Sequence, residues 1–347
     1  MRPLLHPSLG RVWRDESTVQ IGLKPDHAVI LGGLGQIDKM LLRALDGRHD
    51  MSALRLLATV GDGDPSCADR LIRMLADAGV IVDGAHDTNS ETDTGGRTHR
   101  DLEPDPDAAS LALVARDVAG GRHAMVARGR CRVDVLGAGR VGAGIARLLA
   151  AAGIGEVCVE DPEPTTSADI SPGGLGRDAL GRARDRALDD VIRAERPGRQ
   201  QAARAADLVV LAPVAGTGRD QAAQLLKDGI PHLLAQVVET TGIVGPLVLP
   251  GESSCLRCHD LHRTDRDSGW PVVLDQAARN PPTRPACDAG LAAAVGGLAT
   301  AQALGHLDGF EVATRDGTIE LDLPYGLPRR RSWTAHPACG CMWSKLR

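Results

Sequence analysis

Four of the eight cysteines form two close pairs whose spacing is typical of metal ligands. Cys255 and Cys258 form a C-x-x-C pair, and Cys339 and Cys341 form a C-x-C pair further along the chain. Four thiolates in two close pairs suit tetrahedral zinc, and Gly340 lets the backbone turn tightly around the ion. Because such a site has no open coordination position, we expect the zinc to be structural.

The first pair also fits two other chemistries, because residues 255–259 spell CLRCH. C-x-x-C-H can attach a c-type haem, but this happens outside the cytoplasm in bacteria, and the N-terminus has no apolar run that predicts a signal peptide. A redox dithiol is the second alternative, although no thioredoxin-like pattern surrounds the pair. His259, His262 and His336 could each replace one thiolate, but we interpret them as exposed loop residues.

A glycine-rich loop, GAGRVG, lies between a predicted strand and a predicted helix. Gly137, Gly139 and Gly142 have the spacing of a dinucleotide fingerprint. Asp161 ends the next predicted strand, 22 residues after Gly139, where a ribose-binding carboxylate is expected. This context predicts a Rossmann-like unit. The nucleotide itself stays an open question, because the same glycines are also needed where a helix packs closely on a strand.

Composition excludes several classes of protein. Of 347 residues, 43% are hydrophobic and 24% charged, and the net charge is -5, without the basic surplus of a nucleic-acid binder. Four Trp, one Tyr and one Phe offer few stacking platforms for bases. The stretch 289–305 is built from Ala and Gly and is too weakly hydrophobic for a membrane span. We expect a cytoplasmic protein that binds neither nucleic acid nor membrane.

Residues 1–84 predict a small winged-helix-like α+β domain. TVQIGL and HAVILGGL flank the turn Lys24-Pro25-Asp26, which predicts a β-hairpin. Three helical patterns follow, the clearest at 66–78, and VIV at 80–82 predicts a terminal strand. Residues 85–108 are almost without apolar side chains, and we interpret them as a flexible linker.

Residues 109–347 predict an α/β domain. A strand–helix–strand pattern surrounds the glycine loop, and DLVVLAPV and IPHLLAQVV add buried strands, so we expect a mostly parallel sheet. The small-residue helix at 289–305 permits close packing, either within the core or at a homodimer interface.

The N-terminal domain suggests peptide capture rather than DNA binding. Arg70 and Arg73 on the third helix are balanced by Asp69 and Asp77, so the basic stripe that DNA needs is missing. A hairpin edge beside a helix can instead take up an extended peptide as an added strand.

The groove for such a peptide would have two walls. Val29, Ile30 and Leu31 would form the strand edge, and Arg70 and Arg73 are candidate contacts on the facing helix. An ordinary solvated helix face is the alternative interpretation of the two arginines.

The motifs of residues 110–345 resemble those of the ThiF/ubiquitin-activating-enzyme-like superfamily. The resemblance rests on the glycine loop, the strand that ends at Asp161, the small-residue helix and the two separated Cys pairs. It implies a nucleotide role for Gly137, Gly139, Gly142 and Asp161, and a structural zinc on the Cys pairs. Members that adenylate a carboxylate also carry a G-x-G-G-x-G loop, an S-N-L-x-R-Q motif, a later Lys and an acidic end to a further strand.

This chain departs from those adenylating motifs at several positions. Arg140 replaces the third glycine, DISPGGLGRD at 169–178 stands where S-N-L-x-R-Q belongs, and Arg182 or Arg184 replaces the Lys. Pro213 ends the strand that should end in an acidic residue. Adenylation needs cations against the triphosphate and an acidic group that holds magnesium, so ATP use stays open.

The combination of segments is more specific than either segment alone. Residues 1–84 resemble PqqD, and SSCLRCHDLHRTDRD at 253–267 resembles the leader-peptide-binding cyclodehydratase partners of azole-forming (TOMM) pathways. The resemblance implies a scaffold that binds a precursor leader peptide and presents it to a YcaO-type cyclodehydratase. The alternatives are an adenylating enzyme and an NAD-dependent oxidoreductase. Cys287 is interpreted as a buried or incidental thiol rather than a thioester-forming one.

Overall fold

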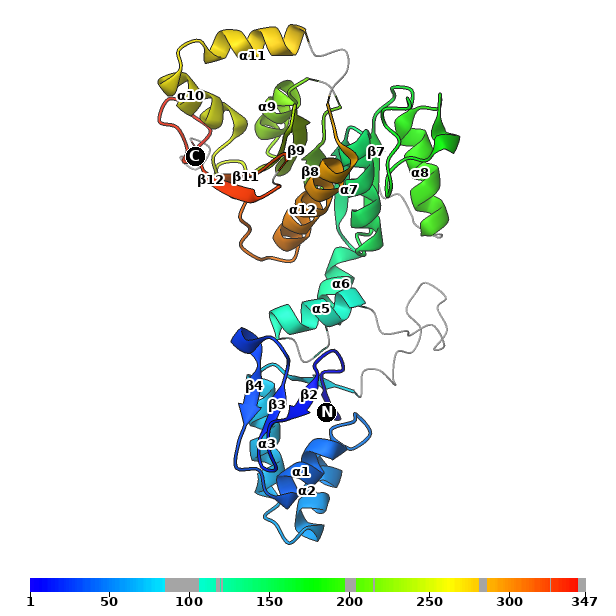
Figure 1. The fold of residues 1–347 in the computed structure, drawn as a ribbon, viewed down its shortest axis with the longest axis vertical. Helices are drawn as coiled ribbons and strands as arrows, with labels where there is room; N and C mark the ends of the chain where they lie inside the picture. The colour runs from blue at the N-terminus through cyan, green and yellow to red at the C-terminus, as the bar shows by residue number, and fades with distance from the viewer. Residues whose placement is uncertain are drawn as a thin grey trace. The chain divides into compact units, whose positions relative to one another are not determined.

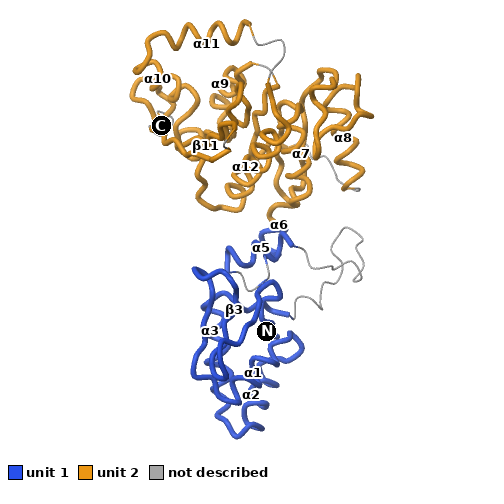
Figure 2. Tube along the Cα trace, viewed as in Figure 1, with its two compact units in different colours: residues 1–126 blue, residues 127–347 orange. Residues whose placement is uncertain are grey.

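The computed structural model describes residues 1–84, 106–116, 119, 121–196, 204–214, 216–280, 286–324 and 326–342. The chain divides into two compact units, Met1–Val126 and Ala127–Arg347 (Figure 2). Most of the predicted linker, residues 85–105, lies outside the described residues, and the helix α5 begins at Pro106, within the range predicted as linker.

The first unit contains a three-stranded sheet, a two-stranded sheet and helices (Figure 1). Its strands are β1 (Pro3–Leu5), β2 (Arg11–Trp13), β3 (Val19–Ile21), β4 (Val29–Leu31) and β5 (Ile81–Asp83). Its helices are the 3-10 helix η1 (Pro25–His27), α1 (Gln36–Ala44), α2 (Met51–Val60), α3 (Ser66–Asp77) and α5 (Pro106–Ala115), with α6 (Arg122–Arg128) at the border of the units.

The predicted hairpin is confirmed, because β3 and β4 pair antiparallel with Val19 opposite Leu31. The strand β2, which the sequence did not predict, extends the hairpin on its other side, so that the order is β2-β3-β4. One face of this sheet is buried with the apolar faces of α1, α2 and α3 in a common core around Val19, Ile21, Leu54 and Leu75.

The second unit is a mixed α/β fold around a seven-stranded sheet (Figure 1). Its strands are β6 (Arg132–Leu136), β7 (Glu156–Glu160), β8 (Leu208–Leu211), β9 (His232–Val238), β10 (Thr241–Val248), β11 (Gly317–Asp322) and β12 (Pro328–Ser332). Its helices are α7 (Arg140–Ala151), the 3-10 helix η2 (Arg177–Ala179), α8 (Arg184–Glu195), α9 (Arg219–Lys227), α10 (Leu256–Arg266), α11 (Trp270–Arg279) and α12 (Ala289–Leu307).

The strand order of the large sheet is β12-β11-β10-β9-β8-β6-β7. β7, β6, β8 and β9 pair parallel, as predicted from the glycine loop and the fully buried run LVVL of β8. The strands β10, β11 and β12 continue the sheet antiparallel, which the sequence analysis did not predict. The result is consistent with a Rossmann-like fold.

The small-residue helix α12 packs against α7 and the strands β9 and β10. Its buried face includes Ala292, Gly296, Ala299 and Ala303, and these small side chains let the two helix backbones approach closely. This face therefore belongs to the core. Within the described residues, no helix combines the length and apolar character needed to cross a membrane.

Candidate metal centre and nucleotide loop

The two cysteine pairs converge on one point of the second unit. The Sγ atoms of Cys255, Cys258, Cys339 and Cys341 all lie within 4.8 Å of one another. The first pair sits at the start of α10, with Cys255 as its N-cap residue, and the second lies in the turn after β12. Gly340, between the second pair, has a φ of 78°, a left-handed conformation that suits glycine.

The sulfur positions fit a tetrahedral zinc ion. Zn–S bonds of about 2.3 Å place the sulfurs of a regular tetrahedron about 3.8 Å apart. The Sγ–Sγ distances here are 3.8 Å between Cys255 and Cys258, 3.5 Å from Cys255 to Cys339 and 3.4 Å from Cys258 to Cys341. The donor set therefore suits zinc in both chemistry and spacing.

The protonation of these thiols also fits a cation site. The thiol of Cys255 donates to Cys258, which raises the pKa of Cys255 and lowers that of Cys258 to about 4. Burial raises the pKa of Cys341 to about 12. Four thiols so close together cannot all ionise without a compensating positive charge, and a bound cation would provide that charge.

Two histidines and one aspartate form a cluster beside the cysteines: His262, Asp265 and His336. His336 Nδ1 accepts the backbone N–H of Ala338 at 3.1 Å, so its Nε2 carries the proton and donates to Asp265 at 2.9 Å. His262 Nε2 lies 3.0 Å from the carbonyl oxygen of Thr334. These contacts join α10 to the turn that carries the second Cys pair.

His259 was expected to be an exposed loop residue, and this expectation is wrong. Its side chain is 3% exposed and stacks on Trp333 with ring centroids 4.5 Å apart. Arg263 lies over the same indole at 5.4 Å, and burial lowers the pKa of His259 to about 3. No local pattern indicates this contact, because Trp333 lies 74 residues further along the chain.

The glycine loop joins β6 to α7 at the carboxyl ends of the parallel strands. Gly137 has a φ of 101°, and a Cβ there would lie 2.1 Å from the carbonyl oxygen of Ala212. A Cβ at Gly142 would lie 1.9 Å from the carbonyl oxygen of Gly137, and one at Gly139 would lie 2.8 Å from Val214. All three positions therefore need glycine for packing, which agrees with the structural interpretation of the motif.

Asp161 lies at the loop as predicted, but its carboxylate is already engaged. It accepts the backbone N–H of Ala138 at 2.8 Å, and it pairs with Arg184 at 3.1 Å. Arg184 also lies 3.1 Å from Asp169, which in turn accepts the backbone N–H and the hydroxyl of Thr166. We name Asp161, Arg184 and Asp169 the buried triad, since their side chains are between 5% and 10% exposed.

The other cations considered for a phosphate have different surroundings. Arg182 pairs with Asp190 at the surface. Arg140 is the first residue of α7, and its guanidinium donates to the carbonyl oxygen of Cys287 at 2.8 Å. Its Nε is buried and has no hydrogen-bond partner among the described residues. Cys287 is half-buried, and burial raises the pKa of its thiol, as expected for an inert cysteine.

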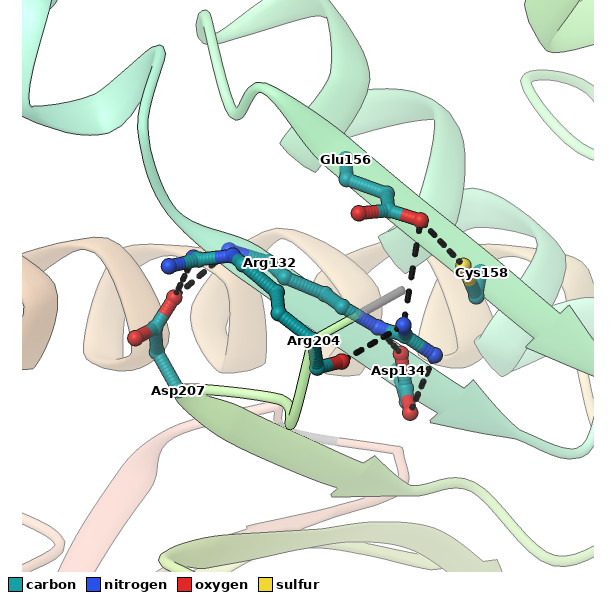
Figure 3. A network of polar contacts seen from close by, with 6 residues as sticks. All are labelled: Arg132, Asp134, Glu156, Cys158, Arg204 and Asp207. Carbon is teal, nitrogen blue, oxygen red and sulfur yellow. Dashed lines mark hydrogen bonds and ion pairs between the residues drawn. The ribbon is translucent and has the colours of Figure 1, made fainter. Parts of the chain in front are cut away.

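A second polar network lies at the opposite, amino-terminal ends of the parallel strands (Figure 3). Arg132 donates to Asp134 at 2.9 Å and to the carbonyl oxygen of Arg204 at 2.7 Å, and its backbone N–H donates to Asp207. Cys158 donates to Glu156 at 3.4 Å. Ligands of open α/β sheets bind at the carboxyl ends, so this network serves to fix β6, β7 and the start of β8.

The predicted peptide groove lies on the first unit. β4 is an edge strand of its sheet, and Ile30 is 51% exposed, while Leu31 points into the core. On α3, Arg70 donates to the sulfur of Cys67, and both Arg70 and Arg73 are exposed. The structure thus shows an exposed strand edge and an exposed helix face, and peptide binding there stays a prediction.

By sequence, no protein-family model and no curated protein matches the chain. By structure it is similar to Escherichia coli MccB, solved with succinimide, at a TM-score of 0.70 with 13% identity and 99% of both chains covered. The chain shares the fold of MccB. The MccB structure with ATP gives a TM-score of 0.70 at 14% identity, covering 99% of this chain and 100% of that one. PaaA gives 0.69 at 17% identity, covering 94% and 99%.

Proposed function

We propose that the chain binds a ribosomally made precursor peptide and activates it by ATP-dependent adenylation. The observation that carries this proposal is the match to MccB over nearly the whole of both chains, first unit included. MccB has been solved with ATP and with its peptide MccA, and it is described as a biosynthetic enzyme of microcin C7. The sequence analysis favoured a scaffold, and the structural comparison now supports the adenylating alternative better.

The glycine loop offers a suitable place for the triphosphate. α7 begins at the carboxyl ends of the strands, and its N-cap residue Gly139 has no side chain to satisfy the first N–H groups of the helix. These N–H groups and the helix dipole favour an anion. Arg140, in the first turn, adds a guanidinium whose Nε has no hydrogen-bond partner in the part of the chain that the structure describes.

In the reaction that we propose, a peptide carboxylate oxygen forms a bond to the α-phosphorus of ATP. The bond from that phosphorus to the bridging oxygen breaks, and pyrophosphate leaves. Arg140 would stabilise the developing charge on the phosphates. The buried triad carries two carboxylates and one guanidinium beside the loop, and it would hold the loop in shape by the hydrogen bond from Ala138 to Asp161.

The test is exchange of labelled pyrophosphate into ATP, with and without the precursor peptide encoded beside the gene. We expect peptide-dependent exchange that Arg140→Ala reduces by about 100-fold, the usual effect of removing one group that stabilises transition-state charge. Arg182→Ala is the matched control, because that arginine pairs with Asp190 at the surface. No exchange at saturating ATP, with the peptide bound, would rule out adenylation.

A second candidate function is the scaffold of an azole-forming pathway, working with a YcaO-type cyclodehydratase. Three observations favour it. Arg184 already forms an ion pair with Asp161, Arg182 forms one with Asp190, and Pro213 follows β8 in place of an acidic residue. This candidate predicts tight leader binding and stimulation of a separate cyclodehydratase, without pyrophosphate exchange. An NAD-dependent oxidoreductase has no further support in the described residues beyond the glycine loop.

Other parts of the proposal apply to both candidates. We propose that residues 1–84 form a PqqD-like, winged-helix-like leader-recognition domain, joined by a linker at 85–108 to a ThiF-like domain at 109–347 in a cytoplasmic protein. The leader would lie along Val29–Leu31 beside Arg70 and Arg73. The four cysteines would hold a structural zinc, which ties the start of α10 to the turn after β12.

A further inference from the structure

The first unit has a second sheet edge, opposite the β4 edge on which the leader is expected. Among the described residues β2 pairs with β3 alone, and its three residues are exposed. Arg14 donates its backbone N–H to Thr18 at 2.9 Å, across the end of this ladder. Because hydrogen-bonded and non-hydrogen-bonded pairs alternate in an antiparallel ladder, the neighbouring Trp13 turns its backbone N–H and C=O away from β3. This edge is open to an added strand.

A hollow of about 360 Å³ adjoins this edge and is lined by Trp13, Asp15, Glu16, Lys39 and Arg43. The indole of Trp13 is 40% exposed, and the ammonium of Lys39 lies 5.8 Å from its ring centroid. An exposed tryptophan thus lies beside a cation and next to an edge strand. Exposed aromatic anchors of this kind are enriched where proteins bind partners.

The cations and the carboxylates of the hollow come from different elements of the fold. Lys39 and Arg43 lie four residues apart on α1, on one face of the helix, and neither has an ion-pair partner among the described residues. The carboxylates come from the β2–β3 turn instead. Asp15 accepts the backbone N–H of Ser17 at 2.7 Å, and this hydrogen bond lowers the pKa of Asp15, so the carboxylate serves its own turn. Glu16, the other carboxylate of the hollow, also comes from this turn, and among the described residues no ion pair joins either carboxylate to Lys39 or Arg43. The two α1 cations therefore face the hollow without an ion pair.

We propose that β2 and α1 form a second docking edge, which binds an extended peptide segment with an acidic side chain. The segment would pair with the outward backbone groups of Trp13, and its carboxylate would lie between Lys39 and Arg43. An extended strand fits because main-chain hydrogen bonds at a sheet edge give affinity and side-chain pockets give specificity. The inference rests on the proposed function in one respect, since the segment would belong to the precursor peptide.

The test selects peptides from a random-sequence phage library on the full chain and on two charge-reversed variants. Both variants also carry Arg70→Ala and Arg73→Ala, so that the predicted leader groove does not select acidic peptides. The first variant adds Lys39→Glu and Arg43→Glu, and the matched control adds Arg2→Glu and Arg48→Glu, two exposed cations that do not line the hollow. We expect the unchanged chain and the control to enrich peptides with Asp or Glu. The first variant should instead enrich peptides with Lys or Arg, because only its docking edge has changed sign.

A fluorescein-labelled acidic peptide from this selection then gives affinities by anisotropy. Reversing Lys39 and Arg43 should weaken its binding about tenfold or more. Trp13→Ala should weaken the binding by a similar factor, because the indole ring that contacts the peptide is lost. Thermal unfolding should show that all variants are equally stable. Binding unchanged in both, no acidic preference in the selected peptides, or an equal loss in the Arg2 and Arg48 control would overturn the proposal. Pyrophosphate exchange is measured separately, so acidic peptides bound at β2 by an exchange-inactive chain would count against adenylation alone.

Discussion

Arg184 holds its guanidinium 3.1 Å from the carboxylate of Asp161 in the interior of the second unit. The same carboxylate accepts the backbone N–H of Ala138, so the ion pair connects the first turn of α8 to the glycine loop. Any ligand that is to use Asp161 as a ribose acceptor must compete with this arrangement. The pair therefore has a structural role that can be measured without knowing the ligand.

Replacing Arg184 with Met should strongly destabilise the protein. The substitution leaves Asp161 and Asp169 buried without their cation, and removing one partner of a buried pair costs about 3–5 kcal/mol. Urea denaturation measures the free energy of unfolding. Arg182→Met, which breaks an exposed pair with Asp190, is the control and should cost less than about 1 kcal/mol. Equal effects of both substitutions would contradict the importance of the buried triad.

Two glycines of α7 should respond in opposite directions to the same change. Gly142→Ala brings a Cβ to 1.9 Å from the carbonyl oxygen of Gly137, so we expect a large loss of stability whether or not a nucleotide binds. Gly144→Ala meets nothing within 4 Å and removes a flexible residue from the helix, which should stabilise it by about 0.5–1 kcal/mol. Thermal unfolding of the two variants without ligand is the measurement.

The four clustered cysteines, Cys255, Cys258, Cys339 and Cys341, form a tetrad that should bind about one zinc ion per chain. Cys255→Ser or Cys341→Ser should remove the metal and lower the melting temperature, because the tetrad joins α10 to the turn after β12. Cys287→Ser is the control, since that half-buried thiol lies outside the tetrad. Metal analysis of the purified variants decides the matter. Bound haem, or a folded metal-free protein of unchanged stability, would disprove the zinc proposal.

Mild acid should weaken the second unit through His232. Burial lowers the pKa of this histidine below its usual 6.5, and its Nε2 has no hydrogen-bond partner in the structure. The unfolded chain then binds a proton that the folded chain does not, so stability is complete above about pH 6.5 and falls as the pH drops below it. The limiting slope is about 1.4 kcal/mol per pH unit for one group.

His232→Leu should flatten this dependence when urea denaturation is compared at pH 7.5 and pH 5.5. His6, His259 and His306, whose pKa values burial also lowers, contribute in the same direction and set the slope that remains. Replacing the exposed His27 is the control. An unchanged slope in His232→Leu would show that the ring is not kept neutral by burial.

Local patterns were enough to predict much of the fold. The turn at Pro25 between two apolar runs predicted the β3–β4 hairpin, and the glycine spacing predicted the parallel βαβ unit. The strands β10, β11 and β12 were missed. β12 is the sequence PRRRS, entirely exposed, and its pairing with β11 comes from cross-strand ion pairs rather than from an apolar pattern. Such pairing depends on neighbours in space and leaves no period in the sequence.

The candidate site, like the fold, could be predicted only where a local spacing of residues indicates it. Cys255, Cys258, Cys339 and Cys341 were predicted together because metal ligands come in recognisable spacings. The buried triad was not, because a sequence shows that Arg184 is a cation but not which carboxylates enclose it. The hollow at β2 was also missed, since Trp13 and Lys39 lie on different elements and meet only after folding.

The two kinds of sheet edge in this chain differ in how they meet other molecules. At β12, Arg329 and Arg331 turn back to Asp322 and Glu320 of their own sheet, and Pro328 lacks a donor. A foreign strand would have to separate these charges before it could pair, which protects the large sheet from aggregation when the protein is concentrated. Among the described residues no cross-strand ion pair covers β2, so its outward backbone groups stay available to a partner strand. Protection against misassembly and openness to a partner are thus assigned to different edges.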